Sequence, residues 1–468
     1  MSQMQGIPSH SRKQGFSLTL EPQAAWMAIL GLLLITALCL AAGLGKVLNI
    51  IFPAGSLGVG LFLYLRYPIL YVGFTWWVFF LTPFIRRVSD FRSGFTDPSP
   101  MLLAPPLVAM IAIVTFYRNL PKAHEQGGLP FILSAMGVFY GFLVGMINGL
   151  PVPAIISLMS WVSPILFGFH LFINWRDYPS YRENIQRTFL WCVLVTATYG
   201  IYQYLVAPEW DRFWLIETKL YTSMGKPEPL GLRVWGTMNS PLHFAVVMLA
   251  GNILLFIGQG TLRIPGLAVG ILSILLTSVR TVWGGFIVAL ITLIASLKGG
   301  SQIRLIAFTL TIVLCVLPLS TVEPFSQVIQ SRITSLSNVK DDQSAKDRAN
   351  LYGTTLNLAL SEVIGKGNGT LQPIDSGIIE LLLTLGWMGA IPYIGGLLLS
   401  FYSLFQGSKP KSDPFASATR AIIVGFLPML AGSNVIVGIA GMVFWGFLGL
   451  GMAANKYHFP GGKRSERA

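Results

Sequence analysis

Repeated apolar runs constrain the fold of this chain more than any other feature. From residue 25 to residue 452, runs of roughly 17 to 25 residues follow one another with short polar stretches between them. A run of this length matches a helix that crosses a hydrocarbon core about 30 Å thick. The runs lack the alternation typical of barrel strands. Only 11% of the residues are charged, against about 25% in soluble domains. We therefore expect an all-α polytopic integral membrane protein.

The apolar runs indicate about 12 to 14 transmembrane helices. The candidate spans are 25–44, 47–65, 68–85, 101–117, 130–148, 151–173, 187–207, 238–258, 262–277, 281–297, 303–319, 377–405, 417–431 and 434–452. Two longer polar segments, 208–236 and 322–376, interrupt the series. Residues 25–453 are thus predicted to form one transmembrane domain with two larger loops, of which 322–376 is the longest.

Basic residues predict the orientation of the chain. The net charge is +13, and most Lys and Arg residues stand in short loops beside spans, as the positive-inside rule describes for the cytoplasmic side. This places the tails 1–24 and 454–468 in the cytoplasm, and 208–236 and 322–376 outside. Arg86, Arg87 and Arg92 disagree, so either an early span is miscounted or these arginines bind an anion outside. No basic patch is interleaved with aromatic residues, which argues against nucleic acid.

Metal and disulfide chemistry are not indicated. Cys39, Cys192 and Cys315 all lie inside apolar runs and have no metal-ligand spacing. We interpret them as small hydrophobic residues. The external segments contain no His/Cys cluster or HExxH motif, so we expect neither a metal nor a cofactor.

Three arginines, Arg233, Arg280 and Arg348, fall on the outer side of this topology, where the positive-inside rule does not explain them. Arginine keeps its charge and grips phosphate through a bidentate fork. A single such arginine is readily explained by snorkelling into the headgroup region. Three on one face beside the large loops favour an anion site. Residues 347–361 have helical apolar spacing and predict an amphipathic helix along the membrane surface.

Asp375 stands at the end of the long loop, just before an apolar run. A carboxylate there is commonly a helix N-cap, and the alternative is a general acid or base beside the arginines. Glu380 follows just inside the expected span, where acidic groups are costly and usually paired or functional. The run from Gly365 to Gly369 lacks the features of a phosphate-binding P-loop and indicates a tight turn.

In their order along the chain, these segments resemble the O-antigen ligase and polymerase superfamily of integral-membrane polysaccharide enzymes. The motifs that carry the resemblance are Arg233-Val-Trp-Gly-Thr-Met-Asn-Ser-Pro241, Ser278-Val-Arg-Thr-Val-Trp-Gly-Gly-Phe286, Arg348-Ala-Asn-Leu-Tyr352, Ile364-Gly-Lys-Gly-Asn-Gly369 and the segment from Asp375 to Gly389. The resemblance covers about residues 190 to 450. Within it we expect Arg233, Asn239, Trp283, Tyr352, Gly367 and Glu380 to bind substrate.

The resemblance implies a GT-C-like architecture and glycosyl transfer at the outer face of the plasma (inner) membrane. The donor would be an oligosaccharide on polyprenyl (undecaprenyl) diphosphate, and the transfer needs no metal or nucleotide sugar. Arginines at headgroup depth would stabilise the leaving diphosphate. Membrane lipids and other polysaccharide-assembly proteins are the further partners expected.

One departure from the ligase pattern favours the polymerase branch. Ligases of this superfamily have a histidine where this chain has Asp375, and no histidine occurs between His243 and His458. The resemblance makes Asp375 the candidate base, with Arg280 and Arg348 as the other catalytic residues. The alternatives are a ligase, a transporter of a small anion such as bicarbonate, and a structural scaffold.

Overall fold

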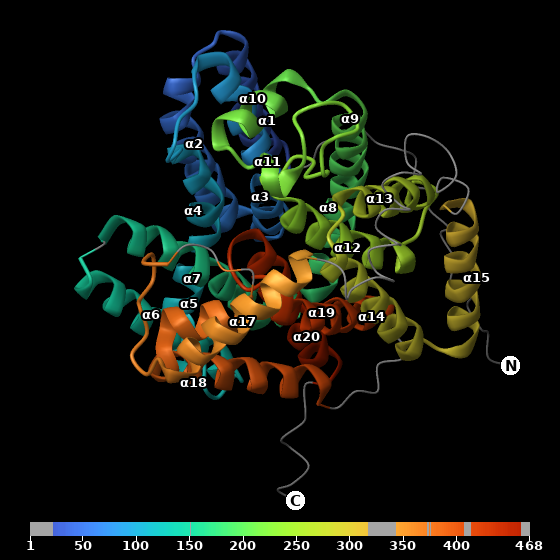
Figure 1. Cartoon of the computed structure of the whole chain (residues 1–468). Coiled ribbons are helices and arrows are strands. Elements are labelled where there is room, and N and C mark those ends of the chain that lie inside the picture. The colour runs from blue at the N-terminus through green and yellow to red at the C-terminus, as the bar shows by residue number, and fades with distance from the viewer. Residues whose placement is uncertain are drawn as a thin grey trace, which may run out of the picture.

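The helices follow the predicted apolar runs closely. The computed structural model describes residues 22–149, 151–316, 343–371, 374, 376–406 and 413–459, and every named element within these ranges is helical (Figure 1). Ten helical stretches among these residues are long and apolar enough to cross a membrane, and three further apolar helices are shorter. The predicted class is confirmed: the chain is an α-helical polytopic membrane protein.

In chain order the helices are α1 (Gln23–Ala41), α2 (Gly45–Arg66), α3 (Pro68–Ser93), η1 (Pro100–Leu103), α4 (Ala104–Met110), α5 (Ile113–Asn119), η2 (Leu120–Lys122), α6 (Leu129–Ile147), α7 (Pro151–Ile173), η3 (Trp175–Asp177), α8 (Tyr178–Cys192), η4 (Val193–Ala197), α9 (Thr198–Val206), α10 (Glu209–Thr218), α11 (Tyr221–Met224), α12 (Pro241–Ile257), α13 (Arg263–Thr277), α14 (Arg280–Ser296), α15 (Gly299–Val316), α17 (Gln343–Ser361), α18 (Gly377–Phe405), α19 (Pro414–Gly432) and α20 (Gly438–His458). Two stretches change helix type on the way: η1, α4, α5 and η2 form one, and η3, α8, the π-helical η4 and α9 form the other.

Polar contacts divide the helix ends between two faces of the bundle. On the first, which we call the loop face, the end of α3 meets the segment that follows α9, and the start of α18 meets the end of α19. On the second, the terminal face, the start of α8 meets the start of α19 and the end of α20 through Tyr178, Asp413 and His458. The loop face carries the polar segments in which the candidate site residues were predicted.

Helix α20 lies in the core of the bundle, and α1 lies at its periphery. In α20, 89% of the apolar window is buried, against 17% in α1. Aromatic side chains fill the centre, where Trp76 of α3 stacks on Phe80 and makes a tilted ring contact with Phe447 of α20. Figure 1 shows α15 at the edge of the bundle beside α14. The interior is thus a packed aromatic core, and α1 leaves much of its surface to the surrounding lipid.

Helix α3 corrects the prediction for Arg86 and Arg87, and Arg92 lies in its last turn. The apolar run ends near residue 85, but the helix continues to Ser93 and contains all three arginines. Arg86 pairs with Asp90 one turn later, with Nε 3.1 Å from Oδ2. Because the charges are satisfied within the protein, the helix extends past its apolar run. The first two arginines are structural, and neither a miscounted span nor an external anion is needed to explain them.

Candidate functional site

Arg233 holds the turn between α13 and α14. Its Nε and Nη2 donate to the carbonyl oxygens of Thr277 and Ser278 at 3.1 and 3.2 Å, and its Nη1 donates to the Ser223 carbonyl at 2.7 Å. Ser278 has a left-handed φ of 56°, which turns its carbonyl towards the guanidinium. Arg233 therefore fixes the backbone two residues before Arg280 and brings these two predicted residues together.

Arg280 is the first residue of α14 and is partly exposed. The first turn of α14 contains no acidic residue, and its N-cap, Val279, has no side-chain acceptor. The chain has no Asp or Glu between Glu228 and Glu323, so α12, α13 and α14 carry basic side chains only, and the nearby acidic residue Glu380 comes from α18. The positive end of the helix dipole and the Arg280 charge add here, which favours an anion.

The beginnings of α14 and α18 meet at one residue, Ser433. Thr281 of α14 and Ser433 share a hydrogen bond between their hydroxyl groups at 3.1 Å. The Ser433 carbonyl accepts from the N–H of Gly377, the first residue of α18, at 3.2 Å. Two helix N-termini and Arg280 thus gather on the loop face. The first N–H groups of α18 are bonded to Ser433 and Ser376, and its first turn carries Glu380, so Arg280 and the start of α14 are the part that favours an anion.

Ser376, rather than Asp375, caps α18. The Ser376 hydroxyl accepts from the N–H of Ile379, so the prediction of Asp375 as an N-cap is wrong. Asp375 itself lies outside the described residues. The Glu380 carboxylate accepts from the N–H of Ile374 at 3.3 Å. Glu380 is therefore paired with the incoming chain and holds that segment against the first turn of α18.

Helix α17 covers the predicted amphipathic segment 347–361 and begins slightly earlier, at Gln343. Arg348 lies in this helix, and the structure describes its backbone but not its side chain. Tyr352, one turn later, is half-buried and packs against the core. Leu356 and Leu360 remain exposed, as expected for a helix whose apolar side faces lipid.

The segment after α17 inserts its backbone into a break in α18. At the break, Gly386 has φ 60° and ψ 179°, far from helical values. In a regular helix the carbonyls of residues 383 and 384 would accept from the N–H groups of residues 387 and 388. The observed bonds are Lys366 N–H to Leu383, Gly367 N–H to Thr384, Trp387 N–H to Glu362 and Met388 N–H to Val363, at 2.8, 3.0, 3.1 and 3.1 Å. These four helix groups therefore have their partners in the inserted segment.

The glycine-rich run was predicted as a tight turn. In the structure its backbone also packs directly against the backbone of neighbouring residues. Gly365, Gly367 and Gly369 all have positive φ values, between 81° and 89°. A Cβ on Gly367 would collide with the backbone of Gly145 in α6, and one on Gly369 with the backbone of Pro153. Glycine is needed here because backbone meets backbone. This role of Gly367 is structural, and its predicted contact with substrate stays a prediction.

Asn239 belongs to a buried network around Arg87. The Arg87 guanidinium is fully buried and pairs with the equally buried Asp211, with Nε 2.6 Å from Oδ1. The other acceptors of its N–H groups are the carbonyls of Gly236 and Met238 and the Asn239 side chain. Asp211 also accepts from Tyr199 and Gln203 at 2.6 and 2.7 Å. The network fastens the 208–239 segment to α3.

Trp283 has a structural contact comparable to that of Asn239. Its indole N–H donates to the Ile274 carbonyl at 3.1 Å and ties α14 to α13. Of the predicted residues, Arg233, Arg280 and Trp283 therefore cluster at one turn, and Glu380 lies near them through the Ser433 contact. The Arg87–Asp211 pair was missed from sequence. The only sign of it in the sequence was an acidic residue, Asp211, in the segment 208–236, and its partner Arg87 lies far away in the chain.

No group of three or more His, Cys, Asp or Glu side chains that could hold a metal ion occurs in the part of the chain that the structure describes. No model of a known protein family matches the chain, and no curated protein matches it either. The function must therefore be argued from the site itself.

Proposed function

We propose that the protein is a polysaccharide polymerase that transfers a polyprenyl-diphosphate-linked glycan onto an acceptor sugar. The observation that carries this proposal is the position of Arg280 at the start of α14, which Ser433 joins to the first turn of α18. Arg233 supports it by fixing the turn that presents Arg280. The ordered resemblance of the motifs to the polysaccharide enzyme superfamily adds the substrate class. In this proposal the loop face is the outer face of the plasma membrane.

The chemistry needs charge stabilisation at the leaving group. The acceptor hydroxyl attacks the anomeric carbon of the donor sugar, and a new C–O bond forms. The bond between that carbon and the diphosphate oxygen breaks, and the lipid diphosphate leaves with the electron pair. Arg280 and the start of α14 stabilise its growing charge, usually the largest contribution to such catalysis. The sequence-based assignment gives the hydroxyl proton to Asp375 and a second diphosphate contact to Arg348.

A reconstituted assay tests the proposal. Purified protein is incubated with lipid-linked repeat units, and the length of the product is measured. We expect wild-type protein to make polymer and Arg280→Ala to lose about a hundredfold in rate while keeping its thermal stability. The matched control is Arg304→Ala, an exposed arginine in α15 near the terminal face. Normal polymer from the Arg280 variant would overturn the proposed role.

A deletion strain separates the polymerase from the ligase. Loss of a polymerase leaves glycan with a single repeat attached to its final acceptor. Loss of a ligase leaves long polymer on the lipid carrier. If the second pattern appears, the same loop-face site serves ligation instead.

The transporter alternative is supported by one observation, the break in α18 at Gly386. Broken helices in transporters often place backbone groups around an ion or substrate. Here those groups are taken by residues 362–367, so the break fastens a segment and leaves the backbone groups paired. Uptake of labelled bicarbonate into vesicles containing the protein, abolished by Arg280→Ala, would favour transport over polymerisation.

A further inference from the structure

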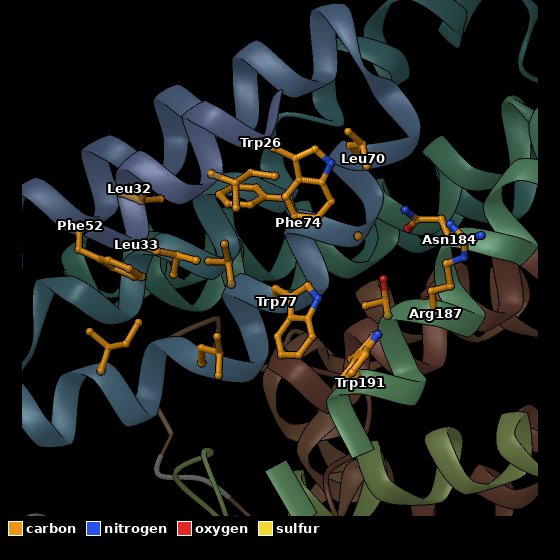
Figure 2. Close-up of a pocket in the computed structure, with 16 residues that line it drawn as sticks. Trp26, Leu32, Leu33, Phe52, Leu70, Phe74, Trp77, Asn184, Arg187 and Trp191 are labelled. Atoms are coloured by element: carbon orange, nitrogen blue, oxygen red, sulfur yellow. The ribbon is translucent and has the colours of Figure 1, made fainter. Parts of the chain in front are cut away.

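A long apolar groove lies between α1, α2, α3 and α8, away from the candidate substrate site. Its volume is about 570 Å³, within the range of small-molecule sites. Figure 2 shows Asn184 and Arg187 of α8 together at one end, near Leu70 and Trp191, and Phe52 of α2 towards the other end. The groove is therefore apolar along most of its length and polar at one end.

The floor of the groove is a single stripe of α3. Leu70, Phe74, Trp77, Leu81 and Ile85 recur at helical spacing and all line it. From Leu70 to Ile85 the stripe rises through fifteen residue steps, or about 22 Å of helix axis. Helix α1 borders one side and α8 the other. An apolar groove of this length and volume accommodates one extended hydrocarbon chain.

The polar end carries an ion pair and an unpaired acceptor. Arg187 Nη2 lies 2.6 Å from Glu183 Oε1, one helical turn nearer the start of α8, and both side chains are largely exposed. The Asn184 Oδ1 is buried and has no hydrogen-bond partner among the described residues. The end of the groove thus offers the cation of Arg187 and, further towards the terminal face, the anion of Glu183.

We propose that this groove binds a zwitterionic aminophospholipid, with one acyl chain along α3. Its phosphate contacts Arg187, and its ammonium group lies beyond the phosphate, near Glu183. An ammonium group carries three donors, and the exposed Glu183 carboxylate accepts from them. The cation of Arg187 and the anion of Glu183 match a zwitterionic headgroup better than the headgroup of an acidic phospholipid. The site belongs to the terminal-face leaflet, so it is separate from the proposed glycan donor on the loop face.

A bulky side chain placed in the groove tests the proposed site for the acyl chain. Leu33 of α1 lines the groove, whereas its neighbour Leu34 does not and is 61% exposed. Protein purified in mild detergent is analysed by native mass spectrometry with added phosphatidylethanolamine. We expect Leu33→Trp to weaken lipid binding about tenfold, and Leu34→Trp to bind as wild type. Equal binding by both variants would overturn the proposal.

Changing the charges tests the headgroup. Glu183→Gln should lower the preference for phosphatidylethanolamine over phosphatidylglycerol about tenfold, and Arg187→Gln should weaken both lipids. Glu228→Gln, at an exposed ion pair on the loop face, is the control and should change neither. Stronger binding of phosphatidylglycerol or of polyprenyl phosphate by wild-type protein would contradict the assignment. Stable wild-type protein that retains no added lipid at all would contradict it as well.

Discussion

Arg87 of α3 and Asp211 of α10 form a fully buried ion pair, with Nε and Oδ1 2.6 Å apart and 124 positions between them in the chain. The pair joins the end of an early helix to the segment that leads into the candidate site. Burying two charges is costly, and their mutual attraction and the surrounding hydrogen bonds offset that cost. The arrangement fastens the segment between α9 and α12 to α3.

Asp211→Asn should therefore destabilise the protein strongly. The substitution leaves the Arg87 charge buried without its counter-ion, which typically costs about 3–5 kcal/mol. The midpoint of thermal unfolding in detergent, followed by size-exclusion chromatography, measures the effect. Glu228→Gln is the control, since its exposed pair with Lys226 is worth about 1 kcal/mol or less. Similar midpoints for the two variants would show that the buried pair contributes little.

Replacement by lysine should affect stability at Arg233 but not at Arg280, and should lower activity at both. Arg233→Lys loses the fork that binds three carbonyls, so we expect a lower unfolding midpoint and lower activity together. Arg280→Lys keeps a charge at the start of α14 and should lower activity about tenfold, with an unchanged midpoint. Polymer formation and thermal unfolding are measured on the same preparations. A selective loss of activity in Arg233→Lys would instead indicate direct contact with substrate.

Gly367→Ala should open the contact between the inserted segment and α6. The new methyl group meets the Gly145 backbone, and φ is +87°, so we expect a loss of about 1–3 kcal/mol or more. Gly353→Ala is the matched control, because a Cβ there meets nothing within 4 Å inside α17. Its helix should gain up to about 1 kcal/mol. Limited proteolysis of the α17 segment reports the difference, and equal cleavage rates would rule out the anchoring role.

Stability should fall in acid because of Asp413, which lies just before α19 on the terminal face. Burial raises the pKa of this carboxyl, but hydrogen bonds from His458, Tyr178 and two backbone N–H groups outweigh burial and lower the pKa below its ordinary value. A lowered folded-state pKa stabilises the protein above the unfolded value of about 4. That contribution is lost as the pH falls through the folded-state pKa.

The unfolding midpoint of wild type, measured from pH 6 to about pH 3, should fall more steeply than that of Asp413→Asn, which keeps a capping oxygen but does not titrate. Asp97→Asn, at a largely exposed carboxyl, should follow wild type. Parallel profiles for wild type and Asp413→Asn would exclude this carboxyl as the source of acid sensitivity.

The spans were predictable because hydrophobic length is a local property of the sequence. The predicted ranges 151–173 and 377–405 coincide with α7 and α18. The end of α3 was missed because its last two turns are stabilised by ion pairs with Asp90 and Asp211, which local hydropathy does not register. A contact between distant residues has no signature in either segment alone.

The candidate site was predictable in part for a similar reason. Topology places Arg233 and Arg280 on one face, and the structure joins them through Ser278. The capping by Ser376 and the bonding of residues 362–367 to α18 depend on backbone geometry, which residue types constrain only weakly. Glycine spacing indicated a turn at 365–369, but no pattern in the sequence indicates which helix will accept it.

The exchange of backbone bonds between residues 362–367 and α18 also defines where the chain can be divided. Chimeric proteins are commonly cut at the membrane boundary, which here would fall near Gly377. Such a cut would separate Leu383 and Thr384 from the donors that complete their hydrogen bonds, inside a low-dielectric layer where replacement by water is costly. The smallest transferable unit therefore begins before Glu362 and ends after Met388, and the helix and the preceding glycine-rich segment must be exchanged together.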